Sequence, residues 1–221
     1  MSAGVSAGVR LVTVAHGTRH PAGNEVARDL TAAAASRLGM PGVAAFVELA
    51  APLLTSVLES DEPSVVVPLL LSTGYHVRED LAAVAGRALG PDPLLAAAQV
   101  SRLVAAGARP GAPLVMVAAG SRDPLATRDL MLATTLLSEA WGGSVRLATL
   151  GGLGRRPSDV VRPGDVVSPY LLAAGFFATR CRAEALAAGA GVVAEVIGPH
   201  PHVVDLVVSR ATELLRARRS A

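Results

Sequence analysis

The chain has 221 residues, of which 51% are hydrophobic, 3% are aromatic and 17% are charged, with a formal net charge of +2. This length allows one large or two small domains, and the small charge and scarce aromatics exclude a basic, ring-bearing face for nucleic acid. No apolar run approaches the roughly 20 residues that cross a bilayer, and the first ten residues lack the apolar core of a signal peptide. We therefore expect a cytoplasmic protein without a membrane or nucleic-acid partner.

The first half of the chain predicts a strand, a helix and two further strands. The β-branched run at 11–15 is typical of a strand that is buried on both faces. Residues 21–38 carry apolar side chains at helical spacing, and Gly39 can end that helix in a left-handed conformation. Two apolar runs, at 43–49 and 64–71, predict the remaining strands.

The second half repeats this order. It predicts strands at 114–118, 144–150 and 165–172 and a helix at 124–141 that ends before Gly142. Both halves then predict a helix after a Gly-Pro-Xaa-Pro sequence, where proline suits the first turn. Alternating strands and helices favour parallel sheets with right-handed crossovers. We therefore predict an α/β fold in which two similar domains, each a parallel sheet flanked by helices, face each other across a cleft.

Three sequence blocks recur in the same order, which indicates an internal duplication. AHGTRHP at 15–21 returns as AAGSRDP, VVVPLLLSTGYHVR at 65–78 returns as VVSPYLLAAGFFAT, and GPDPLL at 90–95 returns as GPHPHV. The Gly/Pro-rich stretch at 107–113 marks the boundary. We assign residues 1–107 to the first domain and 108–221 to its repeat.

Three chemically capable side chains follow the three strands of the first half. They are His16, Glu48 and His76. Ligands bind beyond the carboxyl ends of strands in open parallel sheets, so we expect these groups to converge. Their counterparts in the repeat are Ala119, a position near Thr149, and Phe177. The repeat keeps the glycines of the motif but loses its chemistry, so we expect activity in the first half alone.

The motifs AHGTR at 15–19, VELAAP around Glu48, and VPLLLSTGYHVR at 67–78 resemble those of the sirohydrochlorin chelatases, the class II tetrapyrrole chelatases of the cobalt/iron type. The resemblance extends essentially over residues 10–216. It implies the chelatase-like fold and the long, internally duplicated form whose N-terminal half is active. The implied activity is that of a lyase that inserts Fe²⁺, for sirohaem, or Co²⁺, for cobalamin, into a tetrapyrrole and releases two protons.

The residues suit this chemistry. Metal insertion needs an entry ligand for a divalent ion and an acceptor for two pyrrole protons, and His16 and His76 can serve as both. Glu48 could orient a histidine, bind the ion transiently or pass protons to water. We expect no permanent cofactor, because Fe²⁺, Co²⁺ or Ni²⁺ would be a substrate.

The resemblance also implies a substrate with many peripheral carboxylates, which guanidinium groups match well. Arg19 and Arg78 flank the two histidines. Arg122 repeats Arg19, so a structural role stays open for Arg19 and is favoured for Arg122. The predicted substrate-binding residues are Arg19, Ser72, Thr73, Gly74, Tyr75 and Arg78.

Two other functions remain open. A non-catalytic metal or tetrapyrrole carrier would keep the same cleft and ligands, and only turnover separates it from an enzyme. A two-lobed solute-binding protein is disfavoured because we find no secretion signal. Because the duplication supplies both lobes of a cleft within one chain, we expect a monomer with pseudo-twofold symmetry.

Three minor features complete the predictions. His20 is expected to cap the helix at 21–38. The glycine-rich stretch at 150–156 is interpreted as a loop that covers the cleft rather than a dinucleotide site. His200 and His202 could form a secondary metal site, but their spacing at a helix start places them on different faces.

Overall fold

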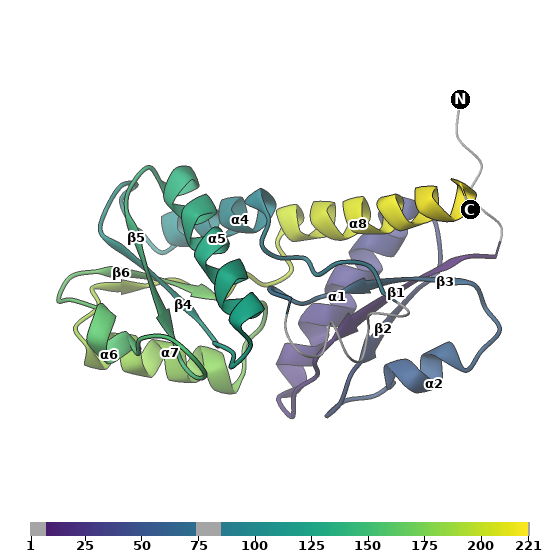
Figure 1. Ribbon diagram of the computed structural model, residues 1–221, viewed down its shortest axis with the longest axis horizontal. Coiled ribbons are helices and arrows are strands. Elements are labelled where there is room, and N and C mark those ends of the chain that lie inside the picture. The colour runs from purple at the N-terminus through teal and green to yellow at the C-terminus, as the bar shows by residue number, and fades with distance from the viewer. Residues whose placement is uncertain (1–7, 74–84, 221) are drawn as a thin grey trace.

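The computed structural model describes residues 8–73 and 85–220, which form two α/β halves side by side along the long axis of the molecule (Figure 1). The first half holds a parallel sheet in the order β2-β1-β3, and the second holds a parallel sheet in the order β5-β4-β6-β7. The strands are β1 (Arg10–Ala15), β2 (Gly42–Phe46), β3 (Ser64–Pro68), β4 (Leu114–Ala118), β5 (Val145–Thr149), β6 (Val166–Tyr170) and β7 (Val192–Val193). The predicted fold class is confirmed.

Proline and glycine set the ends of the long helices. α1 and α5 each begin at a proline and end before a glycine in the left-handed region, with φ of 63° at Gly39 and 73° at Gly142. Both predicted helices therefore have the expected bounds. The described helices are α1 (Pro21–Leu38), α2 (Leu54–Leu58), α4 (Pro93–Ala105), α5 (Pro124–Trp141), α6 (Pro157–Val160), α7 (Phe176–Ala187) and α8 (Pro201–Ser220). None of these described helices is long and apolar enough to cross a membrane.

The two halves exchange their last helices. α4, which ends the first half of the chain, packs against α5 and β6 of the second half. α8, which ends the chain, returns across the molecule and packs against α1 and β3 of the first half (Figure 1). Each sheet is therefore covered partly by a helix from the other half of the sequence, and the two halves form one body.

Polar contacts hold the exchanged helices in place. Within the buried layer, the Gln99 side chain of α4 donates to the Ser168 hydroxyl of β6 over 2.8 Å. On the other side, α8 forms an ion pair with α1 through Asp205 and Arg37. The boundary predicted at residue 107 lies between α4 and β4, and it stays a prediction because the packing crosses it.

Candidate active site

The pairing of β1 with β2 brings His16 and Glu48 together. Ala15, at the end of β1, pairs with Phe46, at the end of β2. Two more backbone hydrogen bonds extend this register past the strands. The Val47 N–H donates to the Ala15 carbonyl over 2.9 Å, and the Glu48 N–H donates to the His16 carbonyl over 3.0 Å. The side chains meet beyond the sheet, where His16 Nε2 lies 3.1 Å from Glu48 Oε1. The predicted convergence of these two residues is therefore present.

The nitrogen of His16 that faces the carboxylate is Nε2. A neutral imidazole that donates from Nε2 to the carboxylate keeps its lone pair on Nδ1. Glu48 is therefore placed to orient the ring, as a carboxylate does behind a metal-binding histidine. Both side chains are about half exposed, at 45% for His16 and 53% for Glu48, so water reaches the pair.

Gly17 makes the close approach of these two chain segments feasible. Its φ is 95°, and a Cβ atom built on it would lie 1.8 Å from the Glu48 carbonyl oxygen. Any other residue would push the second strand end away from His16. Gly120 repeats the arrangement in the second half, with φ of 85° and a built Cβ 2.0 Å from the Gly151 oxygen. The motif glycine is therefore part of the scaffold in both halves.

The hydroxyl of the motif is also structural. Thr18 Oγ1 accepts the His20 N–H over 3.1 Å, and Ser121 Oγ accepts the Asp123 N–H over 3.0 Å at the same place in the repeat. Asn24, buried in α1, adds two bonds in the first half by accepting from the Thr18 N–H and donating to the Thr18 carbonyl. These bonds fix the turn that presents His16.

The capping role expected of His20 is wrong. His20 stands at the N-cap position of α1, but its side chain forms no capping hydrogen bond. Asp123 does cap α5, because its Oδ1 accepts the Leu125 N–H over 2.9 Å. A carboxylate oxygen reaches the helix N–H groups in the second half, whereas in the first half the turn depends on Thr18 and Asn24.

The counterpart of Glu48 in the second half is Gly151 rather than Thr149. Thr149 pairs with Ala118 as Phe46 pairs with Ala15, so Thr149 corresponds to Phe46. The expectation near Thr149 was wrong by two residues, because it applied the offset of the third strand to the second. The second half thus has Ala119 and Gly151 in place of His16 and Glu48, with no side-chain ligand at either position.

His16 stands at the wall of a cleft of about 350 Å³ between the two halves. The first half contributes the end of β1, the first turns of α1 and the chain after β3, and the second half contributes the chain between β6 and α7. The lining is mainly apolar and includes Ala15, His16, Gly17, Val26, Leu49, Leu69, Leu70, Leu171, Leu172, Ala173, Ala174, Phe176 and Phe177. A site of this size and character suits an apolar small molecule.

Two phenylalanines form the wall of the cleft in the second half. Phe176 is 70% exposed and Phe177 is 43% exposed, and their rings meet edge to face with centroids 5.4 Å apart. Phe177 stands where the first half of the sequence has His76. The second half therefore has an aromatic surface, which can lie against a flat ring, in place of a histidine. The doubled phenylalanine was visible in the sequence, but the exposure of Phe176 was not.

Four of the predicted site residues, Gly74, Tyr75, His76 and Arg78, lie outside the described residues. Their roles stay predictions. Within the described ranges, residues 8–73 and 85–220, no three His, Cys, Asp or Glu side chains come together as a metal site. Over this part of the chain, His16 and Glu48 are a pair, and the second metal ligand expected, His76, is not tested.

Side chains of the second half form hydrogen bonds with the segment just before these four residues. The Tyr170 hydroxyl of β6 donates to the Leu71 carbonyl over 2.9 Å, and Asp129 Oδ2 of α5 accepts the Thr73 N–H over 2.6 Å. Burial, with the negative charge of Asp129, raises the pKa of Tyr170, so this hydroxyl stays a donor. Neither contact was predicted, because both join residues that are far apart in the sequence. Thr73 and the neighbouring Ser72 are only partly exposed.

The two motif arginines make no polar side-chain contact with the described part of the scaffold. Arg19 and Arg122 are both exposed, and neither guanidinium bonds to another residue within the described ranges. The structural role favoured for Arg122 is therefore unsupported. Arg19 lies beside the cleft, where it lines a second hollow.

Two other sequence features lie away from the cleft. The stretch at 150–156 folds back on its own strand, with the Thr149 N–H donating to the Arg155 carbonyl over 2.8 Å, and none of its residues lines the cleft. His200 Nδ1 accepts the His202 N–H over 3.2 Å and so caps α8. Burial, the neighbouring His202 and the Arg102 guanidinium lower the pKa of His200.

Comparisons with known proteins agree with this geometry. The CbiX family model matches residues 10–106 and again residues 113–214. The cobalt complex of the sirohydrochlorin chelatase SirB from Bacillus subtilis subspecies spizizenii superposes with a TM-score of 0.80 at 22% identity, covering 96% of this chain and 97% of that one. SirB from Bacillus subtilis with Fe³⁺ gives a TM-score of 0.76 at 24% identity, covering 93% and 95%.

A more distant structure has the same fold. CbiX, described as the terminal enzyme for biosynthesis of siroheme in denitrifying bacteria, gives a TM-score of 0.63 at 14% identity over 93% of this chain and 98% of that one. No curated protein matches the sequence closely enough to count as a relative. The fold is that of the chelatases. The two matches to one family model, which together span nearly the whole sequence, place this chain in the CbiX family as an internally duplicated member.

Proposed function

We propose that this chain is a sirohydrochlorin chelatase that inserts Fe²⁺ or Co²⁺ into the macrocycle and releases two protons. The observation that carries the proposal is the His16–Glu48 pair, with 3.1 Å between Nε2 and Oε1, at the wall of an apolar cleft between the two halves. Membership of the CbiX family supports the same activity. The solved SirB structures contain iron or cobalt, and we extend that metal chemistry to this chain.

The metal ion would enter through His16. An imidazole nitrogen suits borderline divalent ions such as Fe²⁺ and Co²⁺, and it leaves other coordination positions open for ring nitrogens. We assign His76 as the second ligand, on the strength of its place in the repeat. A His/Glu set of this kind accepts either ion, so the supply of metal in the cell would decide between iron and cobalt.

Two pyrrole protons must leave as the ion enters the ring. A lone pair cannot hold the ion and a proton at the same time, so His16 would accept a proton only after it transfers the ion to the ring. Glu48, at 3.1 Å, would accept that proton next, which would free His16 to accept the second pyrrole proton by the same route. Both groups are about half exposed, so the proton can continue from Glu48 to water.

The apolar side of the cleft would hold the macrocycle. Phe176 and Phe177 present exposed rings opposite the strand end that carries His16, and both line the same cleft. Ring faces of this kind pack well against a flat conjugated molecule. The second half would then bind substrate while the first half performs the chemistry, which explains why one copy could lose its histidines.

The proposal also covers the oligomeric state, the cofactor and the location of the protein. Because both walls of the cleft come from one chain, we propose that the chain acts as a monomer. Its metal ion would be a substrate, with no resident cofactor, and the cytoplasm stays the expected location.

A direct assay tests the proposal. Purified protein is mixed with metal-free sirohydrochlorin and either Fe²⁺ or Co²⁺ under anaerobic conditions, and the absorbance change on insertion is followed against the uncatalysed rate. We expect a rate that is proportional to protein concentration and saturates with tetrapyrrole. Tetrapyrrole binding without any acceleration for Fe²⁺, Co²⁺ or Ni²⁺ would identify a carrier instead.

A further inference from the structure

A second hollow opens beside the cleft. Its volume is about 500 Å³, and it lies between the turn before α1 and the first turns of α7. It shares Thr18, Gly175 and Phe176 with the cleft, so the two spaces lie next to each other at Phe176. A molecule seated against the phenylalanines can therefore extend its edge into this hollow.

Arginines from opposite halves line this hollow. Arg19 comes from the first half and Arg180 from α7 of the second, and we call the space between them the arginine hollow. In the described part of the chain, the Arg19 guanidinium has no hydrogen-bond or ion-pair partner. Arg180 uses Nε to bind Glu184 over 2.6 Å, which leaves its two terminal nitrogens. Glu184 is not among the residues that line the hollow.

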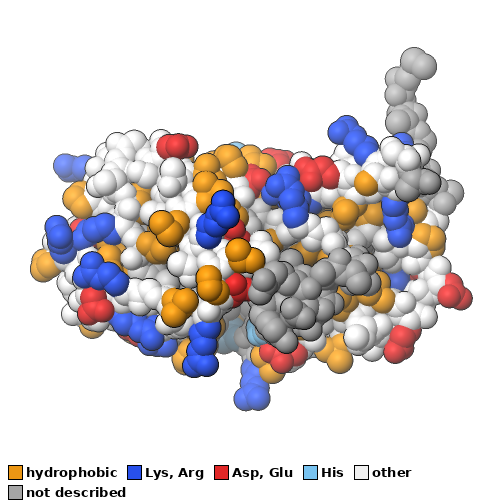
Figure 2. Space-filling view, viewed as in Figure 1, with side chains coloured by type: hydrophobic (Ala, Val, Ile, Leu, Met, Phe, Trp, Pro, Cys, Tyr) orange, Lys and Arg blue, Asp and Glu red, His pale blue; other side chains and the backbone are white. Residues whose placement is uncertain are grey.

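Arg180 is not one of the residues that the two halves of the sequence have in common. The first half has Glu79 at the corresponding position, so the charge is reversed between the two copies. Figure 2 shows arginine side chains spread over both halves on one face of the molecule, without a continuous basic surface. What distinguishes Arg19 and Arg180 is therefore their place beside an apolar cleft rather than the overall charge of the surface.

We infer that the arginine hollow binds a peripheral carboxylate of the tetrapyrrole, held between Arg19 and Arg180. This inference rests on the proposed function, which supplies a macrocycle with carboxylates at its rim. The planar guanidinium fork matches a carboxylate with two parallel hydrogen bonds. The apolar ring would lie on Phe176, and its charged rim would reach the arginines, so each part of the substrate meets a surface of suitable chemistry.

The test is Arg180→Ala, measured in two ways. Steady-state insertion kinetics give KM and kcat for the tetrapyrrole, and fluorescence titration of metal-free tetrapyrrole gives Kd without any turnover. Loss of a charge-assisted hydrogen-bonding group should raise KM and Kd by roughly 10-fold or more while kcat changes little. Arg19→Ala should behave alike, and the double variant should lose less than the two single losses combined, because both groups hold one carboxylate.

Two matched variants separate binding from a structural effect. Arg182→Ala removes a nearby guanidinium of α7 that reaches the Val193 carbonyl and Glu195 instead, so it should leave KM and Kd unchanged. Glu184→Gln removes the ion pair of Arg180 but keeps the cation, so it should not weaken binding. A tetrapyrrole with methyl-esterified carboxylates should bind wild type and Arg180→Ala equally.

The inference is overturned if Arg180→Ala leaves KM and Kd unchanged, if Glu184→Gln or Arg182→Ala weakens binding to the same extent, or if the ester still distinguishes Arg180→Ala from wild type. Circular dichroism and urea unfolding verify that the variants fold. Failure of the proposed function has a different signature: the wild type would bind the tetrapyrrole through Arg180 without inserting metal.

Discussion

His16→Ala should lower kcat for metal insertion by about 10²- to 10⁴-fold, the range expected for loss of a positioned proton acceptor. His16 is the described imidazole at the cleft wall, and it contacts Glu48 at 3.1 Å. Alanine removes both the entry ligand and the group that receives a pyrrole proton. Its side chain already occupies the same place in the second half as Ala119, between the same glycine and strand, so the fold tolerates it. Stopped-flow absorbance of the insertion step measures the effect.

Two comparisons make the result specific. His202→Ala removes a half-exposed imidazole from the start of α8, away from the cleft, and should leave kcat unchanged. Glu48→Gln keeps the shape of the side chain but loses its charge, and should lower kcat by about 10- to 100-fold, as for other groups that support a metal-binding histidine. A near-normal rate in a well-folded His16→Ala variant would refute the assignment of the active half.

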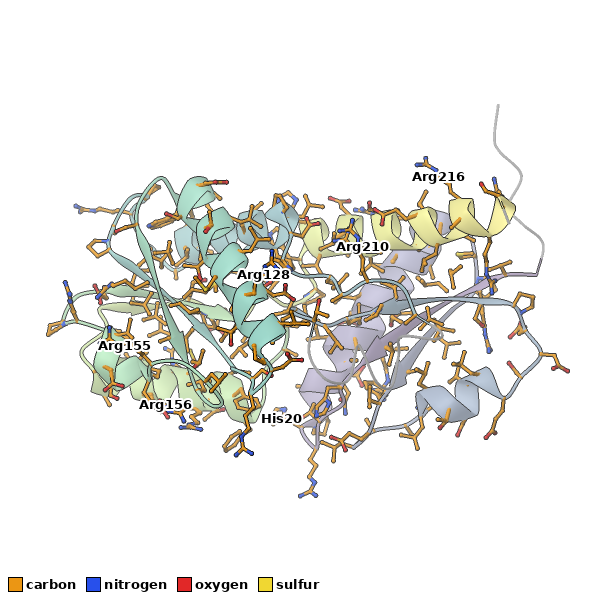
Figure 3. The ribbon with its side chains drawn as sticks, viewed as in Figure 1. His20, Arg128, Arg155, Arg156, Arg210 and Arg216 are labelled. Carbon is orange, nitrogen blue, oxygen red and sulfur yellow. The ribbon has the colours of Figure 1, made fainter. Side chains whose placement is uncertain are left out.

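Arg210→Ala should lower the free energy of unfolding by about 3–5 kcal/mol, the cost of breaking a buried ion pair by removing one partner. The Arg210 side chain is 5% exposed and pairs with Asp92 over 2.9 Å. It also donates to the Ala88 and Leu89 carbonyls. Asp92 in turn caps α4 by accepting the Leu94 N–H. Arg210 thus joins α8 to the start of α4 and fixes both exchanged helices (Figure 3). Urea unfolding followed by circular dichroism measures the loss.

Arg216→Ala is the matched control for this prediction. Arg216 lies on the same helix, but it is exposed and forms no ion pair with the described residues (Figure 3). Its replacement should change the free energy of unfolding by less than about 0.5 kcal/mol. A loss below 1 kcal/mol for Arg210→Ala would show that apolar packing alone holds the two helices.

Much of the fold could be predicted because glycine and proline mark where its elements begin and end. α1 and α5 have the predicted bounds, since proline fits the first turn and Gly39 and Gly142 adopt the left-handed conformation that ends each helix. The meeting of His16 with Glu48 was also predictable, because neighbouring parallel strands end at one edge of a sheet.

The rest depends on contacts that no local pattern encodes. The Gly-Pro-Xaa-Pro sequence marks the start of α4, but nothing in it says that α4 covers the sheet of the other half. Arg180, Asp129 and Tyr170 reach the site only through the folding of distant segments. The error at Thr149 has a similar origin: the segment between β2 and β3 is two residues longer than the segment between β5 and β6, which changes the offset, and only the strand register reveals where.

We propose that the metal binds at His16 in the first half, and that the second half binds none. Anomalous diffraction at the cobalt edge, from crystals soaked in Co²⁺, tests this most directly. We expect one strong peak about 2 Å from a ring nitrogen of His16, the usual distance for an imidazole bound to a divalent metal. A peak only beside Ala119, or only between His200 and His202, would contradict the claim.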